Sequence, residues 1–104
     1  MVKKIFCILD EKANAFLTPF VSENAATATR ALQGAANDKQ SFLGLYPEDY
    51  SVYELGSFDD QTGVIVPASR REYSFRILDL VAGRNAAQPK VAAKEASNGG
   101  EKAS

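Results

Sequence analysis

The alanine-rich run AATATRALQGAA, residues 25–36, constrains the fold more than any other part of the sequence. Apolar side chains recur in it at helical spacing, at Ala25, Ala28, Leu32 and Ala35 or Ala36, which predicts one amphipathic helix. Its apolar face is narrow and made of small side chains, so the helix can lie close on a sheet. The sheet itself must come from the segments on either side.

Polar residues mark both ends of this helix. Ser22 or Asn24 can accept hydrogen bonds from the free N–H groups of the first turn, and Glu23 suits the positive end of the helix dipole. Gly34 weakens the helix by about 1 kcal/mol relative to alanine. The pair Asn37-Asp38 is expected to end it.

Two strands are predicted before the helix. Lys3 to Asp10 is apolar on both faces, as a central strand covered on both sides would be. After a polar turn, Phe16 to Val21 forms a short second strand. Pro19 favours a position at the sheet edge for this strand, because proline donates no ladder hydrogen bond.

Two further strands are predicted after the helix. Tyr50 to Phe58 forms the third, and the β-branched triplet Val64 to Val66, closed by Pro67, forms the fourth. The sequence DDQTG between them predicts a hairpin turn, in which aspartates make side-chain turns and glycine supplies a positive φ. The alternative is a cation-binding loop, but the acids lack the spacing of a calcium loop.

The remaining large apolar residues have less regular patterns. In the connector after the helix, three of them are expected to fold back as a cap over the core: Phe42, Leu45 and Tyr46. The segment from Ser69 is expected to begin extended. Three of its side chains alternate with polar residues and are expected to share a face that the core needs: Tyr73, Phe75 and Ile77.

The predicted fold is α+β, with a hairpin, a helix and a second hairpin forming a small four-stranded antiparallel sheet that carries the helix on one face. Residues 1–82 form a single domain. Residues 83–104 contain no aromatic residue and are expected to be a disordered polar tail. The connector, the C-terminal segment or a second subunit must cover the other face of the sheet, so a homodimer is expected as one possibility.

The residue inventory argues against an enzyme. The chain has no histidine, which excludes Ser-His-Asp and Cys-His arrangements and the usual zinc sites. Its one cysteine, Cys7, is interpreted as a reduced core thiol. The adjacent acids Glu48 and Asp49 are expected to face water rather than to form an acid–base pair. We expect no catalytic residues, no metal and no cofactor.

The apolar segments are too short for a membrane protein. No apolar run approaches the roughly 20 residues needed to cross a bilayer. The run Ile5 to Leu9, after a basic start, is also shorter than the roughly 7 to 15 residues of a signal-peptide core. We expect the chain to stay in the cytoplasm in which it is made.

Charge is divided unevenly along the chain. Residues 1–69 carry 9 acidic and 5 basic side chains, whereas residues 70–104 carry 4 acidic and 7 basic. Aromatic residues interleaved with cations are typical of single-strand binders, in which bases stack on rings and cations follow phosphates. The candidate nucleic-acid-binding residues are Lys3, Lys4, Arg70, Arg71, Tyr73 and Arg76. The alternative is an amphipathic strand whose rings enter the core while its arginines face solvent.

The run PEDYSVYELGSFDDQTG, residues 47–63, resembles a signature of the small nonstructural protein of gokushovirus-type microviruses, isometric phages with circular single-stranded DNA. The shared elements are P-E-D-Y, then L-G, F-D and T-G. Other fragments fit the same family in order: KKIFCILDEKANAF at the start, Pro19-Phe20, Ala28, Arg30, Ala31 and Asn37-Asp38. The resemblance covers about residues 3 to 67.

This resemblance implies a bacteriophage protein that is made in the infected cell and is absent from the mature capsid. Members of the family are suggested to act on viral DNA, in the switch from replication to packaging or as single-strand binders; no catalytic residue is implied. Our first hypothesis is a non-enzymatic accessory protein that binds single-stranded DNA in the host cytoplasm during viral DNA replication or DNA packaging, with affinity that falls steeply with salt. The alternative is an adaptor or assembly factor that engages the replication initiator, the capsid or a host protein, which the acidic first 69 residues favour.

Overall fold

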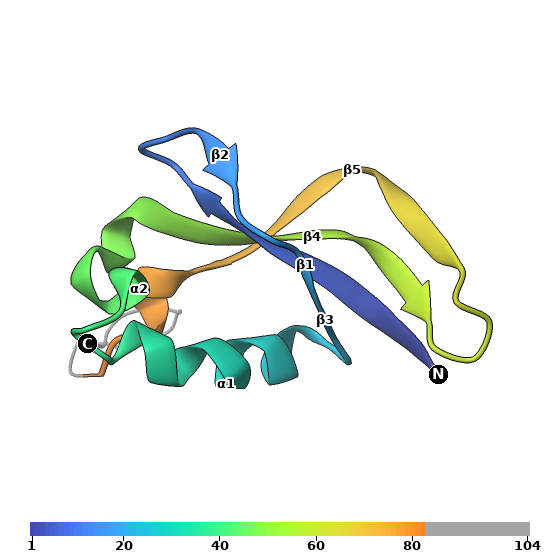
Figure 1. Cartoon of the computed structure of the whole chain (residues 1–104), viewed down its shortest axis with the longest axis horizontal. Helices are drawn as coiled ribbons and strands as arrows, with labels where there is room; N and C mark the ends of the chain where they lie inside the picture. Colours follow the sequence, from blue (N-terminus) through green and yellow to red (C-terminus); the bar gives the residue numbers. More distant parts are fainter. Residues whose placement is uncertain (83–104) are drawn as a thin grey trace, which may run out of the picture.

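The sheet is built around β1 (Val2–Asp10), the central strand of the computed structural model, which describes residues 1–82. The residues from Phe6 to Leu9 are buried consecutively, so both faces of this strand are covered, as its two-sided apolar pattern predicted. The other elements are β2 (Ala15–Phe16), β3 (Phe20–Ser22), α1 (Ala25–Ala36), α2 (Phe42–Leu45), η1 (Pro47–Asp49), β4 (Tyr50–Asp59), β5 (Ile65–Arg76) and η2 (Ile77–Leu80) (Figure 1).

The strands pair in the order β2-β1-β4-β5, all antiparallel, and β3 also pairs with β1. β2 and β3 lie along the same edge of β1, so the predicted strand from Phe16 to Val21 is present but interrupted. Pro19 lies in the interruption, and its position at the sheet edge is confirmed. The predicted α+β fold, a four-stranded antiparallel sheet with one main helix, is therefore confirmed.

The loop between β4 and β5 is a hairpin turn, as predicted. Gln61 N donates to Asp59 Oδ1 at 2.9 Å, and Gly63 N donates to Asp59 O at 2.7 Å. Gly63 has a φ of 76°, which glycine adopts without strain. The prediction that Pro67 closes the last strand is wrong, because β5 continues to Arg76. As the outermost strand of the sheet, β5 tolerates a residue without an N–H donor.

An irregularity in β5 places Tyr73 and Phe75 on opposite faces of the sheet. Tyr73 pairs with Tyr53 and Phe75 pairs with Val52, so Ser74 has no partner of its own in β4. One extra residue in a strand reverses the alternation of its side chains. The expectation that Tyr73 shares a face with Phe75 is therefore wrong: Phe75 packs against the core, whereas Tyr73 is 54% exposed on the other side.

The main helix, α1, covers one face of the sheet. Asn24 is its N-cap, since Asn24 Oδ1 accepts from Thr27 N at 2.9 Å, so the second of the two predicted caps is the one used. Ala28 and Ala36 are buried, which confirms the narrow face of small side chains over most of the helix. Ala25 was expected on the same face but is exposed, because it is the first residue of α1. The larger buried side chains of this core are Phe6, Ile8, Leu43, Tyr50, Val52, Ile77 and Leu80.

The connector after α1 contributes a different cap from the one expected. Leu43, in α2, is buried in the core, whereas Phe42, Leu45 and Tyr46 are each about half exposed. α2 is a single turn, and one turn of helix directs only part of its side chains toward a neighbour. Phe42 still contacts the core edge, with its ring 5.4 Å from that of Tyr50.

Asn37 fixes the end of the described chain to α1. Its Nδ2 donates to Leu80 O at 2.9 Å, and its Oδ1 accepts from Ala82 N at 2.6 Å. These bonds hold η2 against the end of the helix and close this end of the core. The predicted disordered tail, residues 83–104, lies outside the described residues.

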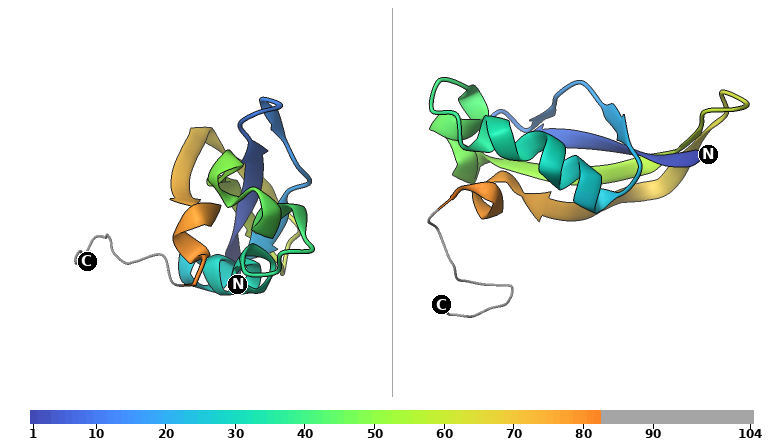
Figure 2. Two further views of the ribbon diagram at one scale, coloured as in Figure 1. Left: turned by 90° about the vertical axis from the view of Figure 1, so that its left-hand side faces the viewer. Right: turned by 90° about the horizontal axis from the view of Figure 1, so that it is seen from below.

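The side of the sheet away from α1, which we call the open face, carries no helix among residues 1–82. Figure 1 shows α1 below the sheet, with β2 above it. Figure 2 shows the β4–β5 hairpin extending beyond α1, so that the far end of the sheet has no helix beneath it. The open face is therefore where exposed side chains of several strands can act together.

Candidate nucleic-acid interface

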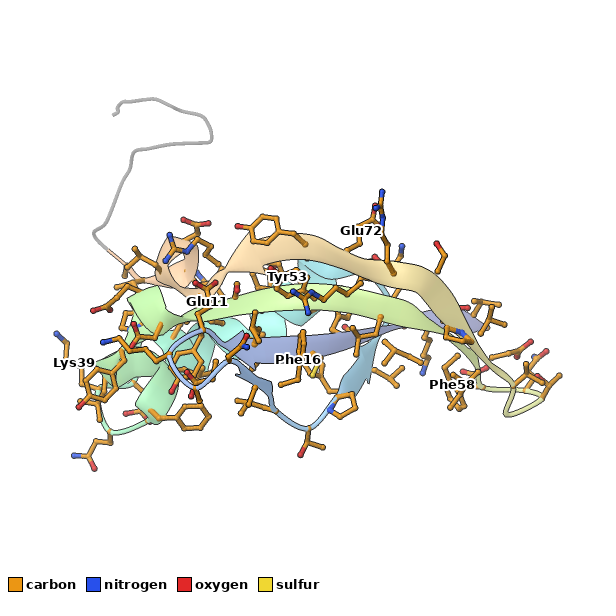
Figure 3. The ribbon with its side chains drawn as sticks, turned by 90° about the horizontal axis from the view of Figure 1, so that it is seen from above. Glu11, Phe16, Lys39, Tyr53, Phe58 and Glu72 are labelled. Atoms are coloured by element: carbon orange, nitrogen blue, oxygen red, sulfur yellow. The ribbon has the colours of Figure 1, made fainter. Side chains whose placement is uncertain are left out.

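Three aromatic rings and one arginine gather on the open face. This group, which we call the aromatic–arginine cluster, consists of Phe16, Tyr53, Arg71 and Tyr73. Strand pairing explains why the rings meet: Tyr53 in β4 lies between Cys7 of β1 and Tyr73 of β5, and residues directly opposite each other in a ladder share a face. Figure 3 views this face and shows Phe16 and Tyr53 near its middle.

The rings of the cluster pack edge to face. The Phe16 and Tyr53 ring centroids are 6.0 Å apart at an interplanar angle of 79°, and those of Tyr53 and Tyr73 are 5.9 Å apart at 77°. Arg71 Cζ lies 5.1 Å from both the Phe16 and the Tyr53 ring centroids. Edge-to-face pairs contribute about 0.5 to 1.5 kcal/mol each, and a cation over a ring is attracted to the ring's negative face. The cluster is thus ordered by its own contacts although Phe16 is 40% exposed.

Arg71 lies in a bulge of four residues in β5. Glu54 pairs with Glu72 and Gly56 with Pro67, so one residue of β4 lies opposite the four residues 68–71 of β5. Bulges of this kind occur next to functional sites, where they redirect a side chain. Here the four residues leave the ladder, and the guanidinium of Arg71 extends over the rings of the neighbouring strands.

Gly56 allows β5 to approach β4 closely beside this bulge. A Cβ atom at position 56 would lie 2.4 Å from Val66 O and 2.9 Å from Pro67 Cα. No heavy atom can occupy that space, so only glycine permits this approach. This explains the glycine in the L-G pair of the sequence signature, Leu55-Gly56. Gly56 pairs with Pro67, the last residue of β5 before the bulge.

The structure brings together two of the six candidate residues, Arg71 and Tyr73. Arg70 lies beside them in the bulge and is exposed. Lys3 and Lys4 lie elsewhere, in the first half of β1, and each is paired with a carboxylate: Lys3 Nζ is 3.5 Å from Asp60 and Lys4 Nζ is 3.1 Å from Glu54. They are not part of the cluster.

Arg76 has a mainly structural position. Its Nη2 donates to Glu48 O at 2.7 Å, which fixes η1 to the end of β5, and its Nε is buried without a hydrogen-bond partner. Asp49 O likewise accepts from Glu11 N at 2.9 Å. The acids Glu48 and Asp49 therefore contribute backbone oxygens that hold the connector in place.

Two residues of the cluster, Phe16 and Tyr53, were not among the sequence candidates. Neither has a neighbouring cation in the sequence. Arg71 is 55 residues from Phe16, and the two meet through three successive pairings, of β2 with β1, β1 with β4 and β4 with β5. The alternation in β4 gave a partial signal, since it places Tyr53 on the face opposite Val52.

The surroundings of the Tyr73 hydroxyl favour its protonated form. Burial raises the pKa of Tyr73 above its usual value, and the negative charge of Asp79 adds to this rise. At neutral pH this hydroxyl is therefore a hydrogen-bond donor at the edge of the cluster. Beside the cluster, Ser51 Oγ donates to Glu11 Oε2 at 2.5 Å, which holds one carboxylate at its border.

Residues 1–82 contain no group of three or more acids or cysteines placed to hold a metal ion. Cys7 is buried, and its Sγ donates to Leu17 O at 2.8 Å; burial raises the pKa of this thiol. No helix in the same part of the chain is long and apolar enough to span a bilayer.

The comparison with known proteins gives one family. The sequence profile described as "Phage ORF5 protein" matches residues 3–80, from the second residue of β1 to the last residue of η2. No curated protein and no solved structure matches the chain.

Proposed function

Since this chain belongs to the Phage ORF5 protein family, we propose that it is a non-enzymatic phage protein that binds single-stranded DNA through the aromatic–arginine cluster. The observation that supports this proposal is the position of Arg71 over the exposed ring of Phe16 and the half-buried ring of Tyr53, on a sheet face without a helix. Single-strand binders combine aromatic surfaces for bases with cations for phosphates. The cluster contains both kinds of group in contact with each other, since Arg71 Cζ lies 5.1 Å from two ring centroids.

In the proposed mechanism, bases stack on the rings of Phe16 and Tyr73, the two members at the outside of the cluster. Arg71 and Arg70 contact the phosphates between the stacked bases. The Tyr73 hydroxyl, which stays protonated, can donate to a phosphate or to a base edge. Stacking is tolerant of sequence because every base has a π-face, so little base preference is expected.

Lys3 and Lys4 are each paired with a carboxylate, so we do not expect them to contact phosphates. The affinity for DNA should therefore depend less on salt than if all the candidate cations took part. For single strands, the logarithm of affinity falls with the logarithm of salt by about 0.7 per neutralised phosphate. If Arg70 and Arg71 contact two phosphates, the slope is about −1.4. Binding should therefore depend on stacking more than on ion release, in contrast to the steep dependence predicted from the sequence.

The test is a titration of a fluorescently labelled single-stranded oligonucleotide at low salt, followed by anisotropy. Arg71→Ala and Tyr73→Ala are each expected to weaken binding roughly tenfold, since one stacked base contributes about 1 to 3 kcal/mol. Arg30→Ala is the matched control, because Arg30 is an exposed arginine on α1. No binding at tens of micromolar protein, or equal losses in Arg71→Ala and Arg30→Ala, would refute the proposal.

The finer identity is also a proposal. The resemblance of residues 47–63 to gokushovirus-type microviruses supports a role in a phage with a single-stranded genome, where replication and packaging both expose such DNA. The host cytoplasm is then the compartment in which the protein acts. Measuring the protein's association with viral DNA through an infection would separate a role in replication from one in packaging.

A second candidate function is a protein-binding adaptor that engages a replication initiator, a capsid protein or a host protein. The observation that favours it is the outer edge of β5, which pairs with no strand among residues 1–82. Such an edge can add a strand from a partner. Recovery of one partner from infected cells by the wild-type chain, together with absence of oligonucleotide binding, would favour the adaptor.

A further inference from the structure

The far end of the open face carries an apolar hollow with a volume of about 260 Å³. We call the residues that line it the distal patch: Ile5, Pro19, Phe20, Val21, Phe58 and Ile65. The strand ladders place four of them on one face, because Val21 pairs with Ile5 and Ile65 pairs with Phe58. Ile65 is 61% exposed and Val21 is 46% exposed, so the side chains around the hollow reach solvent.

Two aromatic rings form part of the wall of this hollow. Phe20 packs on the core ring of Phe6, with ring centroids 5.9 Å apart and an interplanar angle of 28°. Phe58 is less exposed than its neighbour Ile65 and lies in β4, which is paired on both sides. The hollow is thus built from side chains that the fold already holds in place, as most ligand sites are.

The distal patch and the aromatic–arginine cluster lie on the same face of β4. Positions five apart in a regular strand would point to opposite faces. Leu55 has no partner in β1 or β5, however, and this irregularity returns Phe58 to the face of Tyr53. Their partners in β1 are Lys3 and Cys7, four positions apart, which is roughly 13 Å at the rise of a strand. Figure 3 shows Tyr53 and Phe58 along this face.

The charges beside the distal patch favour an anionic ligand. The Met1 ammonium lies 2.6 Å from Asp60 Oδ1, and Lys3 Nζ lies 3.5 Å from Asp60 Oδ2. Two positive charges share one carboxylate, so these three groups carry a net charge of +1. The adjacent acid, Asp59, lies opposite Val2, and the ladder places both on the other face. The excess charge attracts a phosphate chain at a distance, without either cation leaving Asp60.

A base of single-stranded DNA matches both features of the distal patch. The faces of a base stack on aromatic rings, and the phosphate chain that carries it is attracted to positive charge. The aromatic–arginine cluster offers the same combination elsewhere on this face. An uncharged apolar partner would gain nothing from the excess charge, and a second copy of the chain would bring a like charge beside it.

We propose that the distal patch is a second binding site for the same DNA strand, in which one base enters the hollow and contacts the ring of Phe58. This inference rests on the proposed function, because the aromatic–arginine cluster must bind the strand as well. The strand then runs along the open face. Bases stacked about 3.4 Å apart cover the distance of roughly 13 Å between Tyr53 and Phe58 in about four nucleotide steps.

The test compares a thymidine dinucleotide, which is too short to leave the cluster, with a thymidine decanucleotide, which can reach both sites. Binding to the full chain at low salt is followed by nuclear magnetic resonance titration for the dinucleotide and by fluorescence anisotropy for the decanucleotide. Phe58→Leu keeps an apolar side chain and removes the aromatic face. It should weaken decanucleotide binding roughly tenfold and leave dinucleotide binding unchanged. Phe42→Leu is the matched control, since Phe42 is 50% exposed in α2, outside both sites, and should change neither constant.

A second pair of variants keeps the test valid if Phe58→Leu does not fold, which its far-ultraviolet circular dichroism would show. Ile65→Asp and Val66→Asp add the same negative charge at adjacent exposed positions of β5. Ile65 lines the hollow, whereas Val66 lies on the α1 side. Ile65→Asp should therefore weaken decanucleotide binding several-fold more than Val66→Asp does.

The outcomes separate the second site from the cluster. Equal decanucleotide affinity in Phe58→Leu and wild type, or equal losses in Ile65→Asp and Val66→Asp, would overturn the second site. Arg71→Ala should weaken both oligonucleotides, because it acts in the cluster. If Arg71→Ala weakens decanucleotide binding and Phe58→Leu does not, the proposed function holds and the second site alone fails. Absence of binding by both oligonucleotides would refute both.

Discussion

Replacing Gly56 by alanine tests whether the close approach of β5 to β4 is a requirement of the fold. The new Cβ would lie 2.4 Å from Val66 O and 2.9 Å from Pro67 Cα. Both neighbours are backbone atoms, which cannot rotate away as a side chain could, so the two strands must separate locally. The hydrogen bonds of the hairpin next to the bulge would lengthen or break.

The expected cost follows from overpacking, which destabilises by about 1 to 3 kcal/mol at well-packed positions. For a domain of this size, 1 kcal/mol shifts Tm by about 4 to 8 °C. Gly56→Ala should therefore lower Tm by roughly 8 to 16 °C if the cost is about 2 kcal/mol. Thermal unfolding followed by circular dichroism measures this change, and urea unfolding gives the matching loss in free energy.

Gly34→Ala is the matched control, because it adds the same methyl group in a helix. No atom lies within 4 Å of a Cβ at position 34, and alanine is favoured over glycine inside a helix by about 0.5 to 1 kcal/mol. This variant should raise Tm by about 2 to 8 °C. A Gly56→Ala variant as stable as wild type would refute the reasoning, as would destabilisation of both variants to the same extent.

Two further perturbations have defined outcomes. The Met1 ammonium, which is hydrogen-bonded to Asp60, holds the pKa of that carboxyl below its usual value. The corresponding stability is complete above the unfolded pKa of about 3.9 and is lost as pH falls through the lower folded value. Asp60→Asn should remove that pH dependence in denaturant titrations, and persistence would contradict the ion pair. Asn37→Ala leaves Leu80 O and Ala82 N without their hydrogen-bond partner. It should lower the free energy of unfolding in urea by about 1 to 3 kcal/mol. A decrease within experimental error would show that these bonds contribute little.

Local signals in the sequence predicted most of the elements. The cap at Asn24, the alanine face of α1 and the turn chemistry of residues 59–63 each depend on contacts within a few positions of the chain. The two-sided apolar pattern of Lys3 to Asp10 likewise identified the central strand. Pro19 identified the edge for a local reason, its missing donor.

The site could not be predicted in the same way, because strand register determines it. The order of apolar and polar residues in the sequence does not show where a bulge will reverse the faces of the side chains, and this is why Tyr73 was assigned to the wrong face. The ion pair between Lys4 and Glu54 spans 50 positions, so Lys4 looked like a free cation in the sequence. Phe16 and Arg71 meet only after β2 and β5 have taken their places around β1 and β4.

The bulge at residues 68–71 also separates β5 into two parts that keep their own alignment with β4. On one side Pro67 is opposite Gly56, and on the other Glu72 is opposite Glu54. A residue gained or lost between these pairs changes where Arg71 reaches but leaves both alignments intact. Among related phages, we expect this short segment to vary in length and charge more freely than the ladders beside it. A change in the surface offered to a ligand then needs no change in the fold.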